Sequence, residues 1–148
     1  MKKLLGALTI VAATDCGARA PLPRTTGPSL TIQASADATW RAMMGVFGDD
    51  GIPIRVQDRA TGHATTNKSL IRERDRGAWS VCGTDAVPAD HVVFTVSITG
   101  DSTTSTVWAT ARFTRDDVGS FAECTTKGAL EYSIERRIKA RAEGGSTE

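Results

Sequence analysis

Hydrophobic positions recurring every three or four residues indicate a helix near the start of the folded part of the chain. Four residues fall at i, i+3, i+4 and i+7, which is one face of an α-helix: Trp40, Met43, Met44 and Phe47. Ser35 is suited to cap this helix, because its hydroxyl can accept a hydrogen bond from a free backbone N–H group of the first turn. The pattern predicts a helix that begins after Ser35 and buries this face.

Strict alternation of apolar and polar residues predicts several strands. Short strands are expected at 29–34 and 52–57, with Ile52, Ile54 and Val56 facing the core in the second. The segment 63–72 is expected to pair back on it as a hairpin. The clearest alternation lies at 92–98 and 107–113, on either side of a Gly-Asp-Ser turn. Such spacing favours an antiparallel hairpin.

A second amphipathic helix is predicted at 126–142, near the C-terminus. Leu130, Ile134 and Ile138 form its apolar stripe, and Glu135 and Lys139 have the spacing of a favourable i, i+4 ion pair. The segments 73–90 and 115–124 are interpreted as loops.

The predicted order is β-α-β-β-β-β-α, which indicates an α+β fold. A single antiparallel sheet with one apolar face would be covered on that face by the two helices. We expect one domain at 29–143, followed by a disordered tail at 144–148. A chain of 148 residues with a net charge of +1 suits one domain and carries no overall charge that favours nucleic acid.

The N-terminus has the pattern of an export signal. Two lysines precede an uncharged, mostly apolar segment at 4–13, which is too short to span a bilayer comfortably. Cys16 follows it, as in the lipobox of bacterial lipoproteins, which implies a diacylglycerol on its thiol. Cleavage at Ala18-Arg19-Ala20 would instead release a secreted protein without Cys16, and cleavage after Ala13 is a third possibility. We expect a signal peptide at 1–20 and a tether rich in proline at 21–28.

The remaining cysteines, Cys82 and Cys124, are predicted to form a disulfide, since an exported chain reaches an oxidising compartment. Each is expected in a loop, so that the bond would tie the middle loop to the entrance of the last helix. A zinc site using these cysteines with His63 and His91 is disfavoured, because their spacing includes no short paired-ligand motif. No metal or cofactor is expected.

A resemblance to a known family rests on the segment 35–66. The residues that carry it are Ser35, Asp37, Trp40, Phe47, Gly51-Ile52-Pro53-Ile54, Asp58, Gly62 and Thr65. This string resembles the helix-grip domains of BamC-type lipoproteins, which are accessory proteins of the outer-membrane β-barrel assembly machinery. The resemblance implies a helix-grip fold and supplies no catalytic residues. The chain differs from that family in having one such domain and in its expected disulfide.

Candidate chemistry is concentrated on one predicted strand. Trp108, Thr110 and Arg112 would lie on the polar face of the 107–113 strand, and a tryptophan among threonines and arginine has the composition of an interface anchor. The alternative is that Trp108 packs under the 73–90 loop against Trp79. The common catalytic and nucleotide-binding motifs are missing from the sequence.

These observations favour a non-catalytic bacterial envelope lipoprotein that faces the periplasm, most simply from the outer membrane. Its expected partners are the membrane, through the lipid anchor, and another envelope protein, but not nucleic acid. The alternative function is binding of a small apolar ligand between helix and sheet. That alternative predicts a cavity bordered by Trp40, Met44 and Ile138.

Overall fold

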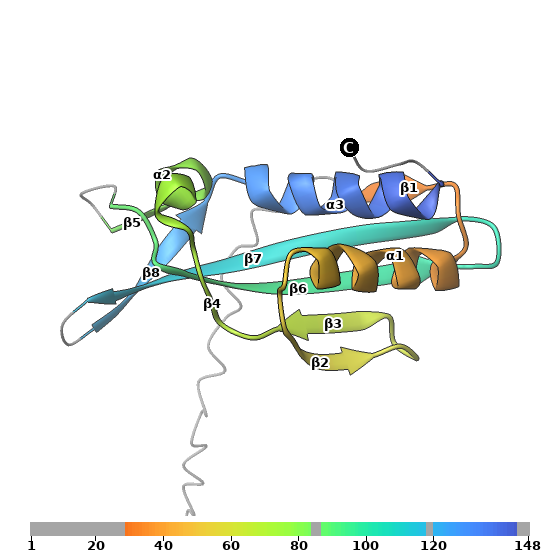
Figure 1. Ribbon diagram of the computed structural model, residues 1–148, viewed down its shortest axis with the longest axis horizontal. Helices are drawn as coiled ribbons and strands as arrows, with labels where there is room; N and C mark the ends of the chain where they lie inside the picture. Colours follow the sequence, from red (N-terminus) through yellow and green to blue (C-terminus); the bar gives the residue numbers. More distant parts are fainter. Residues whose placement is uncertain (1–28, 84–86, 118–119, 145–148) are drawn as a thin grey trace, which may run out of the picture.

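The computed structural model describes residues 29–83, 87–117 and 120–144 (Figure 1). Strands and helices are mixed along the chain, as in an α+β fold. In order they are β1 (Leu30–Ile32), α1 (Ala36–Asp49), β2 (Ile54–Asp58), β3 (His63–Thr66), β4 (Ser69–Leu70), the 3₁₀ helix η1 (Glu73–Asp75), α2 (Arg76–Trp79), β5 (Ser80–Cys82), β6 (His91–Gly100), β7 (Ser105–Asp117), β8 (Ser120–Thr126) and α3 (Ala129–Ala142).

The strands form one antiparallel sheet, which confirms the predicted fold class. Its order is β2-β3-β6-β7-β8-β5, while β1 also pairs with β7 and β4 with β6. The long hairpin of β6 and β7 is the centre of the sheet. Beyond it, β1 pairs with one end of β7, at Ser105 to Val107, and β8 pairs with the other end, from Phe113 onward. The predicted order of elements is too simple, because the sheet has eight strands within the described ranges.

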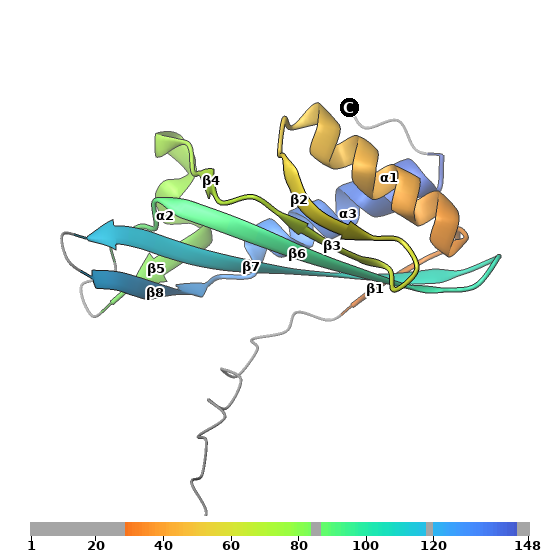
Figure 2. The same ribbon diagram turned by 90° about the horizontal axis from the view of Figure 1, so that it is seen from below.

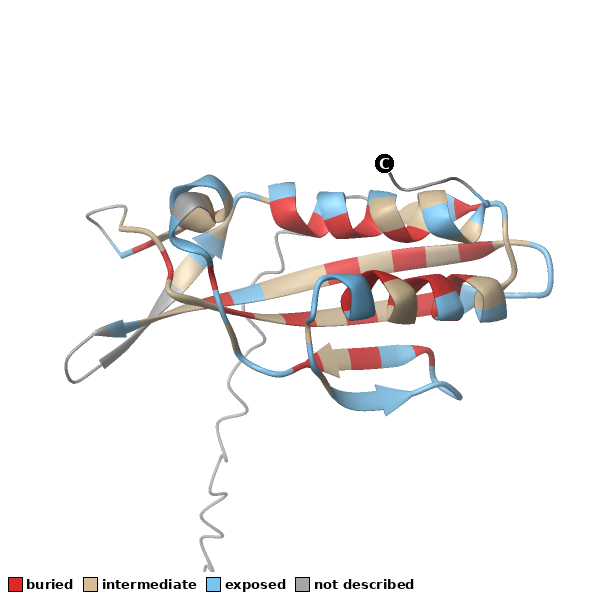
Figure 3. Cartoon of the chain, viewed as in Figure 1, coloured by how far each residue is buried: buried red, intermediate tan, exposed pale blue. Residues whose placement is uncertain are grey.

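Helices α1 and α3 lie on the same face of this sheet (Figures 1 and 2). Burial along β6 alternates with every residue, and the buried residues are Val92, Phe94, Val96 and Ile98 (Figure 3). Because successive side chains of a strand point to opposite faces, the buried set is the one that meets the helices. The two-layer arrangement expected from the sequence is therefore present.

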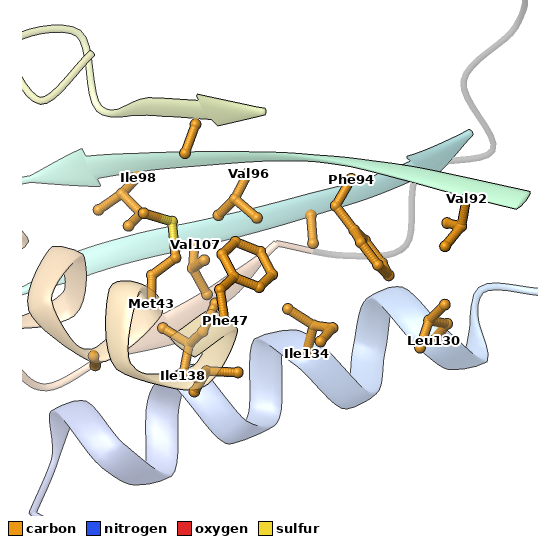
Figure 4. Close-up of a cluster of buried hydrophobic side chains, with 14 of the residues drawn as sticks. Met43, Phe47, Val92, Phe94, Val96, Ile98, Val107, Leu130, Ile134 and Ile138 are labelled. Carbon is orange, nitrogen blue, oxygen red and sulfur yellow. The ribbon is translucent and has the colours of Figure 1, made fainter. Parts of the chain in front are cut away.

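The core fills the space between the helices and the sheet (Figure 4). Met43 and Phe47 enter it from α1, and Ile134 and Ile138 enter it from α3; all four are 2% exposed or less. The Phe47 ring lies with its centroid 6.2 Å from that of Phe94 on β6. The predicted buried face of α1 is confirmed for Trp40, Met43 and Phe47, while Met44 is only partly buried.

The expected cap is present at the start of α1, where the Ser35 hydroxyl accepts a hydrogen bond from the backbone N–H of Ala38 at 3.2 Å. At its other end, α1 is fastened to α3 by ion pairs. Arg137 donates to both carboxylate oxygens of Asp50, at 2.6 and 2.9 Å, and Arg141 pairs with Asp49. These bonds join the end of α1 to α3 near the protein surface.

Both segments interpreted as loops contain strands, so that part of the prediction is wrong. The 73–90 segment holds η1, α2 and β5, and the 115–124 segment is the end of β7 together with most of β8. Their pairing follows from register, since β8 pairs with β7 from Phe113–Cys124 onward and with β5 at Ser80–Thr126. Alternation was not visible in the sequence because α1 does not extend over this end of the sheet (Figure 1).

Three smaller expectations also need correction. The segment 63–72 supplies β3 and the short β4, and β4 pairs with β6 rather than with β2. The last helix begins at Ala129 instead of Thr126, after Gly128 in a left-handed conformation. Lys139 bonds to Glu143 at 2.6 Å instead of to Glu135, because Glu135 is buried against β7.

Candidate functional site

The side of the sheet that points away from the helices carries a second set of side chains, from β6 and β7 and from the strands that pair with β6 and β3. Directly opposite residues of an antiparallel pair share one face of the sheet, so the register identifies the whole set. In the described part of the chain, no helix lies over it (Figure 2). We call this set the uncovered face; it includes Val56, His63, Thr65, Leu70, His91, Val93, Thr95, Ser97, Thr106, Trp108, Thr110 and Arg112.

The three candidate residues of the sequence lie together on this face. Trp108 is opposite Ser97, Thr110 is opposite Thr95, and Arg112 is opposite Val93. Trp108 is half-buried between its neighbours, and Arg112 is exposed. Trp79 is partly buried and packs against the core, and the alternative contact of Trp108 with it stays a prediction.

Hydroxyl groups dominate the middle of the uncovered face and are linked to one another across the strands. The Thr65 and Thr95 hydroxyls are 3.4 Å apart, and the Thr110 hydroxyl donates to the carbonyl of Thr95 at 3.4 Å. Trp108 lies among these hydroxyl-bearing residues, and its role as an interface anchor stays a prediction.

The sequence did not predict that two apolar residues of the uncovered face are exposed. Leu70 is 72% exposed and lies opposite His91, while Val56 is 51% exposed and lies opposite Thr65. Val56 was expected in the core with Ile52 and Ile54. A bulge between Ile54 and Val56 shifts the register and turns Val56 to the other face. A bulge leaves no mark in a pattern of alternating residues, so the sequence offered no signal for it.

His63 and Ser97 form a hydrogen bond that was not predicted from the sequence. Ser97 Oγ lies 2.9 Å from His63 Nδ1. A serine beside a histidine is the starting point of nucleophilic catalysis, which also needs a third group to orient the imidazole. The neighbouring carboxylate of Asp58 instead accepts hydrogen bonds from the backbone N–H groups of Ala60 and Thr61, at 3.0 and 3.2 Å. The pair thus places a hydroxyl and an imidazole side by side on the uncovered face.

A small ionic cluster lies at one end of the uncovered face. Asp116 accepts a hydrogen bond from Lys68 at 2.9 Å, and its other oxygen lies 3.4 Å from His91 Nδ1. The bond from Lys68 and the nearby His91 lower the pKa of Asp116. This cluster joins the end of β7 to Lys68, which precedes β4, and to His91, the first residue of β6.

The predicted disulfide between Cys82 and Cys124 is present, with a Cα–Cα distance of 4.0 Å. The expected loop setting is wrong, since the cysteines lie opposite each other on the paired strands β5 and β8. Sulfurs joined in this bond are not available as zinc thiolates. Within the described ranges, no group of three or more histidine, cysteine and acidic side chains could hold a metal ion.

The apolar-ligand alternative named Trp40, Met44 and Ile138 as the border of a cavity. Trp40 and Ile138 belong to the buried core, and Met44 packs against it from its partly exposed position. A ligand between helix and sheet stays a prediction.

The expected lipid attachment at Cys16, the signal peptide at 1–20, the tether at 21–28 and most of the tail at 144–148 fall outside the described residues. Among the helices that the structure does describe, none is long and apolar enough to cross a membrane. A scan against protein-family models gave no match, and a search of curated proteins gave none either.

Proposed function

We propose that this protein is a non-catalytic envelope lipoprotein, held at a bacterial membrane through Cys16, which binds another envelope protein with the uncovered face of its sheet. The observation that carries the proposal is the half-buried Trp108, which lies with Thr110 and the exposed Arg112 on a face that α1 and α3 leave open. A buried tryptophan or arginine is a frequent centre of protein interfaces.

Other features of the chain support this proposal. Leu70 and Val56 add exposed apolar surface to the same face, and exposed apolar groups with polar surroundings are typical of interaction sites. The disulfide suits a chain that folds in an oxidising compartment. The resemblance of 35–66 to BamC-type domains agrees with an accessory role at the outer membrane, with the domain facing the periplasm.

Photo-crosslinking in the native envelope tests the proposal. A photoreactive residue at position 110, on the uncovered face, is expected to give a discrete adduct with another protein. The matched control is position 132, since Tyr132 is 52% exposed but lies on α3, on the opposite side of the sheet. Mass spectrometry of the same material should find a diacylglycerol on Cys16.

Two outcomes would contradict the proposal. Equal adducts from positions 110 and 132, or adducts from neither, would remove the role of the uncovered face. A mature chain that begins after Cys16 would remove the lipid anchor and leave a secreted protein.

A further inference from the structure

One edge of β7 is paired with two different strands that leave a gap between them. On the side of β7 away from β6, β1 pairs with Ser105 to Val107 and β8 pairs from Phe113 onward. Among the described residues, no strand lies beside Ala109 and Ala111 on that side. A strand edge of this kind presents N–H and C=O groups that can pair with another extended segment. The gap is therefore a place at which a short strand can be added.

The backbone of Ala111 faces this gap. Its partner on β6, Phe94, donates its N–H to the Thr66 hydroxyl of β3, in the direction away from β7. Pairs of an antiparallel ladder alternate between hydrogen-bonded and non-hydrogen-bonded, so Phe94 and Ala111 are a pair of the second kind. Two residues away, Ala109 has the same orientation, and its N–H donates to Glu135 of α3 at 2.7 Å instead of to a strand. The N–H and C=O groups of Ala111 are thus directed into the gap.

The register of β1 determines which residues of this chain reach the gap. β1 begins at Leu30 and is antiparallel to β7, so each residue before Leu30 moves one position further along β7, towards β8. Continued without a shift, this register sets Pro28 opposite Ala109 and Thr26 opposite Ala111. The chain therefore arrives at the gap from β1 in the direction and spacing that an added strand needs.

The same register accounts for the contact from α3. An added strand has Pro28 opposite Ala109, and proline has no N–H to donate to the ladder. This is the position at which Glu135 accepts the N–H of Ala109. At the next bonding position along the added strand, Thr26 has both an N–H and a C=O to offer Ala111. The helix contact and the proline thus coincide, and the position after them is left to Thr26.

We propose that residues 25–28, which lie outside the described ranges, extend β1 along β7, with Thr26 and Ala111 exchanging two backbone hydrogen bonds. The occupant is the chain's own N-terminal segment, because the 28 positions before the described residues end directly beside the gap. A segment joined to β1 has a high effective concentration at this edge. An extended segment from another molecule would have to compete with it.

The docked segment would shorten the tether of the anchored protein, a consequence that rests on the proposed function. Fully extended, residues 17–28 reach at most about 42 Å from Cys16, whereas residues 17–24 reach about 28 Å. Docking therefore lowers the greatest distance between the sheet and the membrane by about a third. The pairing itself does not depend on the lipid, since residues 25–28 follow every cleavage position considered for this chain.

Amide hydrogen exchange of the mature, disulfide-bonded chain tests the added strand at Ala111. The variant Thr26→Pro removes the N–H that would donate to Ala111, and we expect exchange of the Ala111 amide to become about tenfold faster. Thr25→Pro is the matched control, because the N–H of residue 25 would point away from β7, where a proline is tolerated in an edge strand. Val96 in the centre of β6 serves as the reference, and its exchange should be the same in all three chains.

Three outcomes would overturn the proposal. Equal exchange of Ala111 in the wild type and both variants would exclude the added strand. Equal acceleration by Thr26→Pro and Thr25→Pro would exclude the register. Protection of Ala111 that depends on protein concentration and is insensitive to Thr26→Pro would assign the gap to a strand of another molecule. None of these measurements involves the lipid on Cys16 or the crosslink from position 110, so the proposed function and the added strand can fail separately.

Discussion

The two faces of the β6–β7 hairpin are built from neighbouring residues of the same strands, yet they have opposite chemistry. On the helix side, Val96 and Val107 are fully buried beneath α1 and α3. One residue away on each strand, Ser97 and Trp108 lie opposite each other on the uncovered face. The first face is the source of stability, since it removes apolar surface from water. The second is available for contact with other molecules.

The comparison also shows what fixes each face. The core face is determined by apolar side chains that any collapsed structure would bury. The uncovered face is organised by hydrogen bonds between residues distant in sequence, such as His63 with Ser97 and Thr65 with Thr95. Substitutions on the core face should therefore lower the free energy of unfolding more than substitutions on the uncovered face.

Phe47→Ala is expected to have the largest effect on stability. The side chain is 1% exposed and lies between the sheet and α3, so its removal leaves a cavity beside Phe94. Truncation of a buried phenylalanine typically costs about 3–5 kcal/mol in the free energy of unfolding. Urea denaturation measures this loss directly. A loss below about 1 kcal/mol would mean that the core can close around the missing ring.

Removal of the disulfide should have the next largest effect, and a more local one. The bond joins cysteines separated by 42 positions, and it lies on β5 and β8, at the end of the sheet beside α2. The loss of its constraint on the unfolded chain corresponds to up to about 4 kcal/mol. The variant with Cys82→Ser and Cys124→Ser should keep the α1–α3 core and lose hydrogen-exchange protection in β5 and β8. Protection lost equally throughout the sheet would contradict a local role.

The sequence predicted the elements whose pattern is imposed by the core. The α1 face, the alternation of β6 and β7 and the stripe of α3 all reflect contact with one apolar interior. The disulfide was predicted by counting cysteines and by the expected compartment. The strands β5 and β8 were missed, because their pairing gives only weak alternation where α1 does not extend over them (Figure 1).

The candidate site was predictable only in part. Trp108, Thr110 and Arg112 were placed on one face by the period of a strand, which is a local property. The contributions of His63, Leu70 and Val56 depend on the register between strands and on a bulge, neither of which the alternation reveals. Glu135 was expected to pair with Lys139 but accepts a hydrogen bond from the backbone of Ala109 on β7, a contact that depends on the tertiary structure.

Trp108→Ala should have the smallest effect on stability and sharpens the comparison between the faces. Trp108 is half-buried and lies opposite Ser97, and cross-strand pairs contribute about 0.2–1 kcal/mol. We expect the variant to unfold within about 1 kcal/mol of the wild type while losing the crosslink from position 110. A loss as large as that of Phe47→Ala would show that part of the folded chain covers Trp108. An unchanged crosslink would instead remove Trp108 as the anchor and leave the partner contact to the apolar and hydroxyl groups around it.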